Sequence, residues 1–168
     1  GGTAGLYYPF GGGMASVWSK QLSDVNVKVE VTGGSITNVT QVARLESDPG
    51  IAMADVTTDA FLGQGLFEQA LPLRVLFTAY PNIVHILTLE ENGISRVADL
   101  AGKRVALGAQ GSGTAVAATN VLKGLGVALD QIAPRYLNFA ATTAALKEGT
   151  IDAGFIVGGL GIAAGTEL

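Results

Sequence analysis

Apolar stretches with helix and strand periodicity alternate along the 168 residues of the chain. Helical spacing predicts helices over 9–22, from Ser35 to about residue 45, from residue 55 or 57 onward, and over 94–100, 114–125 and 140–148. Short apolar or valine-rich runs predict strands over 25–31, 50–54, 73–79, 83–89, 105–107, 135–137 and 151–157. Because strands that alternate with helices are typical of βαβ units, the pattern predicts an α/β fold with a parallel-rich sheet.

The apolar pattern breaks at Tyr80, Pro81 and Asn82, between two predicted strands. This break predicts a crossover between a first α/β lobe, residues 1–80, and a second α/β lobe, residues 81–168. The first glycines look like the end of a strand and its turn, and the last residues follow a strand. We therefore expect a fragment, in which the first lobe lacks its first strand and C-terminal return and the second lobe is incomplete.

Composition narrows the class of protein. Hydrophobic residues make up 48% of the chain and charged residues 14%, which predicts a folded core. A net charge of -4 without a basic run argues against nucleic-acid binding. No apolar stretch approaches the roughly 20 residues that cross a bilayer. The absence of cysteine excludes disulfides and thiolate metal sites but leaves the compartment open.

The segment from Lys103 to Leu122 predicts a site for a negatively charged group. A short strand over 105–107 leads into a glycine-rich turn, and a helix is predicted from Thr114 onward. The first amides of that helix lack partners within it, and the helix dipole is positive at this end. Ser112 and Thr114 add hydroxyl groups. The pattern therefore predicts a carboxylate or phosphate ligand, and hence a small acidic molecule.

Two further turns precede helices in the same way, at residues 2–9 and 32–35. In an open α/β sheet, turns at the carboxyl ends of parallel strands line the ligand site. Tyr7 and Tyr8 are candidates for a pocket wall, with core packing as the alternative. Asp55 is a candidate partner for a ligand ammonium, with an ordinary helix cap as the alternative. Each glycine turn has a plain structural explanation as well.

Catalytic signals are sparse. His85, the single histidine, lies in an apolar strand, where a core or edge position is more common than a catalytic one. Ser112 lacks the sequence signature of a nucleophile, and no lysine precedes Thr114 as a nucleotide phosphate loop requires. The glycine spacing also misses the dinucleotide fingerprint, and acidic residues do not cluster at metal-ligand spacing. These patterns favour a binding protein without cofactor or metal over an enzyme.

Four motifs carry a resemblance to a known family. They are Gly-Gly-Thr-Ala-Gly-Leu-Tyr-Tyr-Pro-Phe-Gly at 1–11, Val-Glu-Val-Thr-Gly-Gly-Ser-Ile-Thr-Asn at 29–38, Ala-Asp-Leu-Ala-Gly-Lys-Arg-Val at 98–105 and Gly-Ala-Gln-Gly-Ser-Gly-Thr at 108–114. In this order they resemble the TAXI type of TRAP-transporter solute-binding proteins. The resemblance implies a type II periplasmic binding protein with two lobes joined by a hinge. It also implies a precursor with a signal peptide and a periplasmic or other extracytoplasmic location, with a lipid anchor as one option.

The resemblance further implies a ligand such as glutamate or a related amino acid or carboxylate, and TRAP membrane subunits as partners. The ligand-binding residues it implies are Thr3, Ala4, Tyr7, Ser35 and Asp55 in the first lobe and Gln110, Gly111, Ser112, Gly113 and Thr114 in the second. Two alternatives stay open at this point. One is an enzyme on the same scaffold with His85 or Asp55 as a base, and the other is the effector-sensing domain of a regulator.

Overall fold

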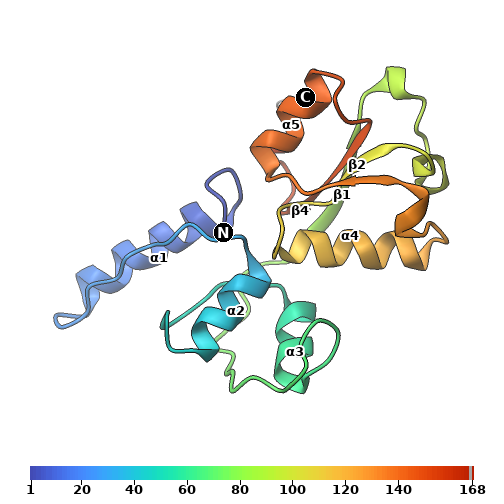
Figure 1. Cartoon of the computed structure of the whole chain (residues 1–168). Helices are drawn as coiled ribbons and strands as arrows, with labels where there is room; N and C mark the ends of the chain where they lie inside the picture. Colours follow the sequence, from blue (N-terminus) through green and yellow to red (C-terminus); the bar gives the residue numbers. More distant parts are fainter. Residues whose placement is uncertain (167) are drawn as a thin grey trace.

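The computed structural model describes residues 1–166 and 168, with helices in the first half and a sheet in the second (Figure 1). The first half holds α1 (Tyr7–Gln21), α2 (Ser35–Ala43) and α3 (Ala54–Leu62). The second half holds β1 (Ile83–Thr88), β2 (Arg104–Ala106), α4 (Gly113–Gly124), β3 (Ala133–Arg135), α5 (Phe139–Lys147), β4 (Ala153–Gly158) and α6 (Ala163–Thr166). Short 3-10 helices lie at Glu90–Asn92, Val97–Leu100 and Leu129–Gln131.

The sheet has the strand order β1-β4-β2-β3 and is mixed. β2 pairs in parallel with both β3 and β4, whereas β1 runs antiparallel to β4, with Ile83 opposite Gly158. The predicted α/β class is therefore confirmed, with an antiparallel strand added at one edge. The strand expected over 135–137 lies two residues earlier, and the helix expected over 94–100 is a 3-10 turn at Val97–Leu100.

Helices cover both faces of this sheet, because successive side chains of a strand point to opposite faces. Val105 and Leu107 pack with Leu122 of α4, whereas Ala106 between them packs with Leu146 of α5. Every residue of β4 is buried. Gly154 in this strand has no room for a side chain, because a Cβ there would overlap the Thr142 side chain of α5. The core of the second half thus holds the end of β2 and the start of α4 in place.

The three strands predicted in the first half are wrong. No strand forms among residues 1–80, all of which the structure describes, and the segments 25–31, 50–53 and 73–79 are extended or irregular. β-branched residues favour extended backbone, but a strand also needs a neighbour with which to share hydrogen bonds. Val31 and Leu76, with 61% and 75% of their surface exposed, show how little packs against these segments. The division of the chain near residue 80 stays a prediction.

The first half has a small core of its own between α2 and α3. Val39 of α2 packs with Val56 and Ala60 of α3, and Leu73 closes this cluster. α1 projects away from the other helices in Figure 1, and Ala15 is its buried residue. Val116 of α4 also packs against the cluster of α2 and α3, and the start of α2 reaches the second half as described below.

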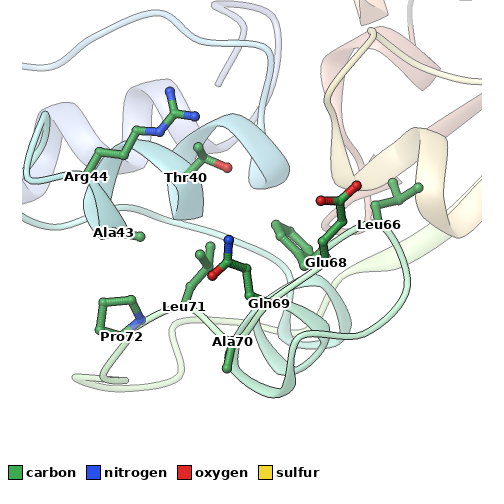
Figure 2. A pocket seen from close by; sticks show the side chains of 10 residues that line it. Thr40, Ala43, Arg44, Leu66, Glu68, Gln69, Ala70, Leu71 and Pro72 are labelled. Carbon is green, nitrogen blue, oxygen red and sulfur yellow. The ribbon is translucent and has the colours of Figure 1, made fainter.

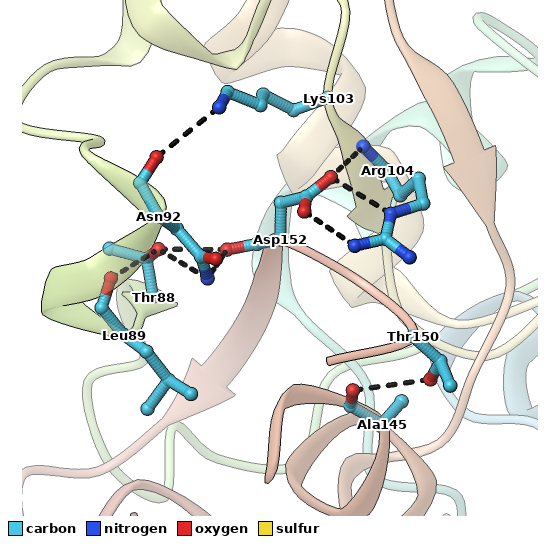
Figure 3. Close-up of polar contacts among 8 residues, drawn as sticks. All are labelled: Thr88, Leu89, Asn92, Lys103, Arg104, Ala145, Thr150 and Asp152. Atoms are coloured by element: carbon cyan, nitrogen blue, oxygen red, sulfur yellow. Dashed lines mark hydrogen bonds and ion pairs between the residues drawn. The ribbon is translucent and has the colours of Figure 1, made fainter. Parts of the chain in front are cut away.

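Asp152 connects three strands of the second half (Figure 3). Its carboxylate accepts hydrogen bonds from the Arg104 backbone N–H at 2.7 Å and from the Arg104 guanidinium at 2.7 and 3.1 Å. Its carbonyl accepts from Thr88 Oγ1 at 2.7 Å and from Asn92 Nδ2 at 2.9 Å. The hydrogen bonds with Arg104 hold the pKa of Asp152 at about 2. This network holds the starts of β2 and β4 together, at the end of the sheet opposite the turn that leads to α4.

Candidate functional site

The turn between β2 and α4 takes the form that the sequence predicts. Gly108 has a φ of +102°, and a Cβ there would stand 2.7 Å from the Thr114 side chain, so only glycine fits. Ser112 precedes α4 and its hydroxyl accepts a hydrogen bond from the Ala115 N–H at 3.1 Å. Ser112 is therefore the N-cap of the helix. This hydroxyl retains its proton to donate, but one of its acceptor sites is used.

The start of α2 packs directly on this turn. The Ile36 N–H donates to the Gly111 carbonyl at 3.2 Å. A Cβ on Gly33 would stand 2.8 Å from the Gln110 carbonyl oxygen, and Gly34 has a φ of +126°. A Cβ on Gly113 would stand 2.7 Å from Ser35 Oγ. Two glycine-rich turns that are far apart in the sequence therefore meet backbone to backbone.

Three helices begin at this meeting point. Ser35 is the first residue of α2 and is 1% exposed, and its hydroxyl accepts from the N–H of Met53, the residue before α3. The Met53 side chain and Ser35 Oγ both lie against Gly113, the first residue of α4. Helix N-termini carry partial positive charge and amides without helical partners. The arrangement thus gathers three such ends around Ser35.

The structure corrects one expectation about this turn. The sequence analysis expects the amides at the start of α4 to await a ligand, but Ser112 and Thr114 are 7% and 5% exposed and Gly113 is buried. Met53 and Ser35 cover them. The physical reason is that glycine at 33, 34 and 113 lets the two turns approach until no space remains. A ligand reaches these amides only when the two turns separate.

Tyr7 brings α1 to the same place. Burial raises the pKa of the Tyr7 hydroxyl, the neighbouring Ser35 and Asn82 side chains lower it in part, and the charge of Asp55 raises it further. Asn82 Nδ2 donates to Tyr7 Oη at 3.4 Å. Tyr7 and Ser35, predicted from separate turns, therefore lie close together, and the charge of Asp55 reaches Tyr7. Asp55 is exposed at the start of α3, and its Oδ1 accepts from the Val56 N–H at 2.8 Å.

Other predicted residues lie less close. Thr3 and Ala4 are exposed in a turn closed by a hydrogen bond from the Gly5 N–H to the Gly2 carbonyl. This turn faces Phe139 of α5, whose ring stands 3.5 Å from the position of a Cβ on Gly5. Gln110 is exposed beside the turn. Their part in ligand binding stays a prediction.

The sequence analysis did not predict Asn82 or Tyr80 as site residues. Tyr80 packs edge-on against the rings of Tyr7 and Phe10, with centroids 6.4 and 5.6 Å apart. Burial, and secondarily Tyr7, raises the pKa of Tyr80 to about 12. The interrupted apolar pattern marks this segment as a crossover, but no motif singles out its side chains. Only the fold shows that they meet α1.

Two surface hollows lie elsewhere. One of about 480 Å³ lies between the end of α2 and residues 66–72, with Arg44 and Glu68 at its rim (Figure 2). The other, of about 440 Å³, lies along α1 near Trp18 and Phe77. Neither includes a predicted ligand-binding residue. The hollows therefore lie away from the closed contact between the turns 33–35 and 110–113.

The bases considered for an enzyme stand apart. His85 lies in the edge strand β1 opposite Ile156, whereas Asp55 begins α3. No group of three or more His, Asp or Glu side chains within residues 1–166 and 168 is placed to hold a metal ion. None of the helices among the described residues combines the length and apolar character that crossing a membrane requires.

Comparison with known proteins assigns the family. A family model described as NMT1-like matches residues 1–168. The chain belongs to the NMT1-like family. This assignment covers both halves of the chain, so the contact at Ser35 lies inside the region that defines this NMT1-like protein.

Solved structures resemble part of this NMT1-like chain. The periplasmic aliphatic sulphonate binding protein SsuA from Escherichia coli is 32% identical over 45% of this chain and 28% of its own, with a TM-score of 0.39. The alkanesulfonate-binding protein SsuA from Xanthomonas axonopodis pv. citri bound to MOPS is 36% identical over 44% and 25%, with a TM-score of 0.40. An ancestral arginine-binding protein bound to arginine is 25% identical over 45% and 31%, with a TM-score of 0.32. The matches span about a quarter to a third of these proteins, so their ligands are not transferred to this chain.

Proposed function

We propose that this chain forms the ligand-binding part of an extracytoplasmic solute receptor, which captures a small acidic solute where α2, α3 and α4 begin. The observation that carries the proposal is the contact of three helix N-termini, from both halves of the chain, at Ser35. Helix N-termini carry partial positive charge, so a carboxylate among three of them is stabilised by their dipoles and by the amides that separation of the two turns frees. Ser112 and Tyr7 supply hydroxyl groups at the same place.

Membership of the NMT1-like family supports this proposal, and so does the similarity to SsuA proteins, which are solute-binding proteins. A periplasmic location agrees with SsuA from Escherichia coli and with a similar SsuA from Methylobacillus flagellatus, both of which are described as periplasmic. The Methylobacillus protein is also described as part of a putative sulfonate ABC transporter. The type of membrane transporter is therefore a separate proposal from the receptor role.

For the transporter we propose the TRAP type, with glutamate or a related amino acid or carboxylate as the solute. The motifs at 1–11 and 29–38 support this choice, since they resemble the TAXI type. The structure adds a physical reason for their glycines, because Gly33 and Gly34 admit the close approach of the 110–113 turn. Co-purification of the full-length protein with TRAP membrane subunits, dependent on added solute, tests this choice. Dependence on ABC subunits instead would contradict it.

Binding then works by separation and closure of the two turns. Separation exposes the amides of α2 and α4, and closure around the solute excludes water, which strengthens each electrostatic interaction. Without solute, the two turns are held together by their own contacts. These contacts lower the affinity for the solute, because the solute must replace them. The protein thus needs no basic side chain to hold an anion.

We expect an acidic amino acid to raise the melting temperature of the full-length protein. A ligand at one hundred times its dissociation constant adds about 2.7 kcal/mol to the free energy of unfolding. Thermal unfolding with L-glutamate, L-glutamine and glutarate measures the shift, with glucose as a neutral control. Mass spectrometry of solute that co-purifies with the intact protein identifies the natural ligand. No shift with any acid, together with a neutral co-purified solute, would sink the proposal.

A further inference from the structure

Buried polar atoms without a partner lie on residues 80–85, which run from the end of the segment that joins the two halves into β1. Within residues 1–166 and 168 they are Tyr80 Oη, Asn82 Oδ1 and His85 Nε2. A buried acceptor or donor without a partner destabilises a protein, so each such atom needs an explanation. One common explanation is a ligand that is bound in the working protein.

Asn82 is connected to the proposed site through Tyr7. Its Nδ2 donates to Tyr7 Oη at 3.4 Å, and the pKa of Tyr7 responds to Ser35, the residue on which the three helices meet. Tyr80 flanks the same tyrosine ring. His85 is different, because it lies opposite Ile156, which packs with Leu6 and Phe139. Of the three unpaired atoms, Asn82 Oδ1 and Tyr80 Oη therefore belong to residues that contact Tyr7, and of these two only Asn82 Oδ1 is purely an acceptor.

Hydrogen-bonding capacity is divided across this site. At the starts of α2 and α4, the Ile36 N–H donates to the Gly111 carbonyl and the Ala115 N–H to Ser112 Oγ, and separation of the two turns frees the first of these donors for the acidic group. The opposite side presents acceptors: Asn82 Oδ1 has no donor, and the exposed carboxylate of Asp55 takes part in neither of the ion pairs found among the described residues. An ammonium group offers three donors and no acceptor, so it complements this second side.

We infer that Asn82 is a specificity-determining residue whose Oδ1 accepts a hydrogen bond from the positively charged amino group of the solute. This inference rests on the proposed function, and it narrows the solute from any small acid to an acid that also carries an amine. The amine lies between Asn82 and Asp55, while the acidic group lies at the helix N-termini. Tyr7 positions the Asn82 amide through the bond that it accepts from Nδ2.

The test uses two matched pairs of probes on the full-length protein. L-Glutamate and glutarate differ only in the amine, and taurine and ethanesulfonate do so with a sulfonate as the acidic group. Isothermal titration calorimetry should show that the member with the amine binds about tenfold more tightly or better, as expected for a hydrogen bond to a charged group. Asn82→Leu should abolish this ratio and leave binding of the member without the amine within about threefold.

Two further variants keep the test decisive. Asn82→Asp preserves the shape of the side chain and adds a negative charge, so it should raise the ratio even if Asn82→Leu does not fold. Asn120→Leu, on the exposed side of α4, is the matched control and should leave both affinities unchanged. Equal affinities within each pair, or a ratio that Asn82→Asp does not raise, would overturn the inference and leave the receptor intact. Failure of all four probes to bind would overturn the proposed function, and this inference with it.

Discussion

At the scale of single residues, Asp152 shows how one partly buried carboxylate secures the sheet. It joins the end of β1, the start of β2 and the start of β4 through its two carboxylate oxygens and its carbonyl (Figure 3). The Arg104 guanidinium pairs with it at 2.7 Å, and the hydrogen bonds from Arg104 keep its pKa at about 2, below the ordinary 3.8. The charged form of Asp152 is therefore bound more strongly in the folded state than in the unfolded chain.

We expect Asp152→Asn to lower the free energy of unfolding near neutral pH by about 1 to 3 kcal/mol, because it leaves Arg104 without its partner. The folded pKa is lowered, so the contribution is present above pH 3.8 and disappears as the pH falls through about 2. Urea unfolding of both proteins at several pH values measures the difference. Asp130→Asn, at an exposed aspartate, is the control. A variant that keeps the full acid sensitivity of the parent would contradict the assignment.

At the scale of elements, the start of α4 depends on the absence of a side chain. A Cβ on Gly113 would lie 2.5 Å from Met53 Sδ and 2.7 Å from Ser35 Oγ. The methionine is flexible, but Ser35 is 1% exposed and bonded to the Met53 N–H. A methyl group here therefore pushes α4 away from α2 and α3.

Gly113→Ala should lower the free energy of unfolding by about 1 to 3 kcal/mol, as overpacking of a full site does. Gly124→Ala, at the other end of the same helix, is the matched control, because a Cβ there meets nothing within 4 Å. It should be neutral or stabilising by up to about 1 kcal/mol, since alanine is the better helix former. Chemical denaturation compares the two. Equal effects would show that the contact at Ser35 is looser than the structure indicates.

At the scale of the whole molecule, the two halves meet through backbone at the turns 33–35 and 110–113 and through Tyr7 and Asn82. Apolar side chains add to this contact, because Val116 of α4 packs on the cluster of α2 and α3 and Leu6 packs on Ile156. The covalent link between them, residues 63–82, has no helix or strand. The two turns can therefore part without breaking a secondary-structure element. This arrangement suits a protein that opens to admit a solute.

We expect a bound acidic solute to slow amide hydrogen exchange in residues 33–37 and 110–115, because the solute holds the two turns closed. Exchange in α1 beyond residue 12 should stay the same, since that part of the helix projects away from the contact. Hydrogen-exchange mass spectrometry with and without L-glutamate measures both regions. Protection confined to residues 40–44 and 66–72, around the hollow in Figure 2, would place the solute there instead.

The local pattern of the sequence predicted the elements that are stabilised by residues close to them in the chain. The strand at 104–106, the glycine turn and α4 follow from periodicity, a capping Ser112 and the need for glycine at 108. The strands predicted at 25–31 and 73–79 fail, because valine content says nothing about a pairing partner. The same limit applies to the proposed site, because the sequence marks Tyr7, Ser35 and Asp55 as candidates from their turns but gives no signal for Asn82.

By itself, the amino-acid sequence determined the α/β class, the glycine positions and the capped helix start, since these depend on backbone preferences and on side chains a few residues apart. The tertiary structure alone decided that two of the glycine turns close on each other, that the amides of α4 are covered, and that Asn82 stands beside Tyr7 with an unpaired oxygen. These features arise from contacts between residues about 75 positions apart in the chain. Such contacts depend on how close whole elements can approach, which no local pattern records.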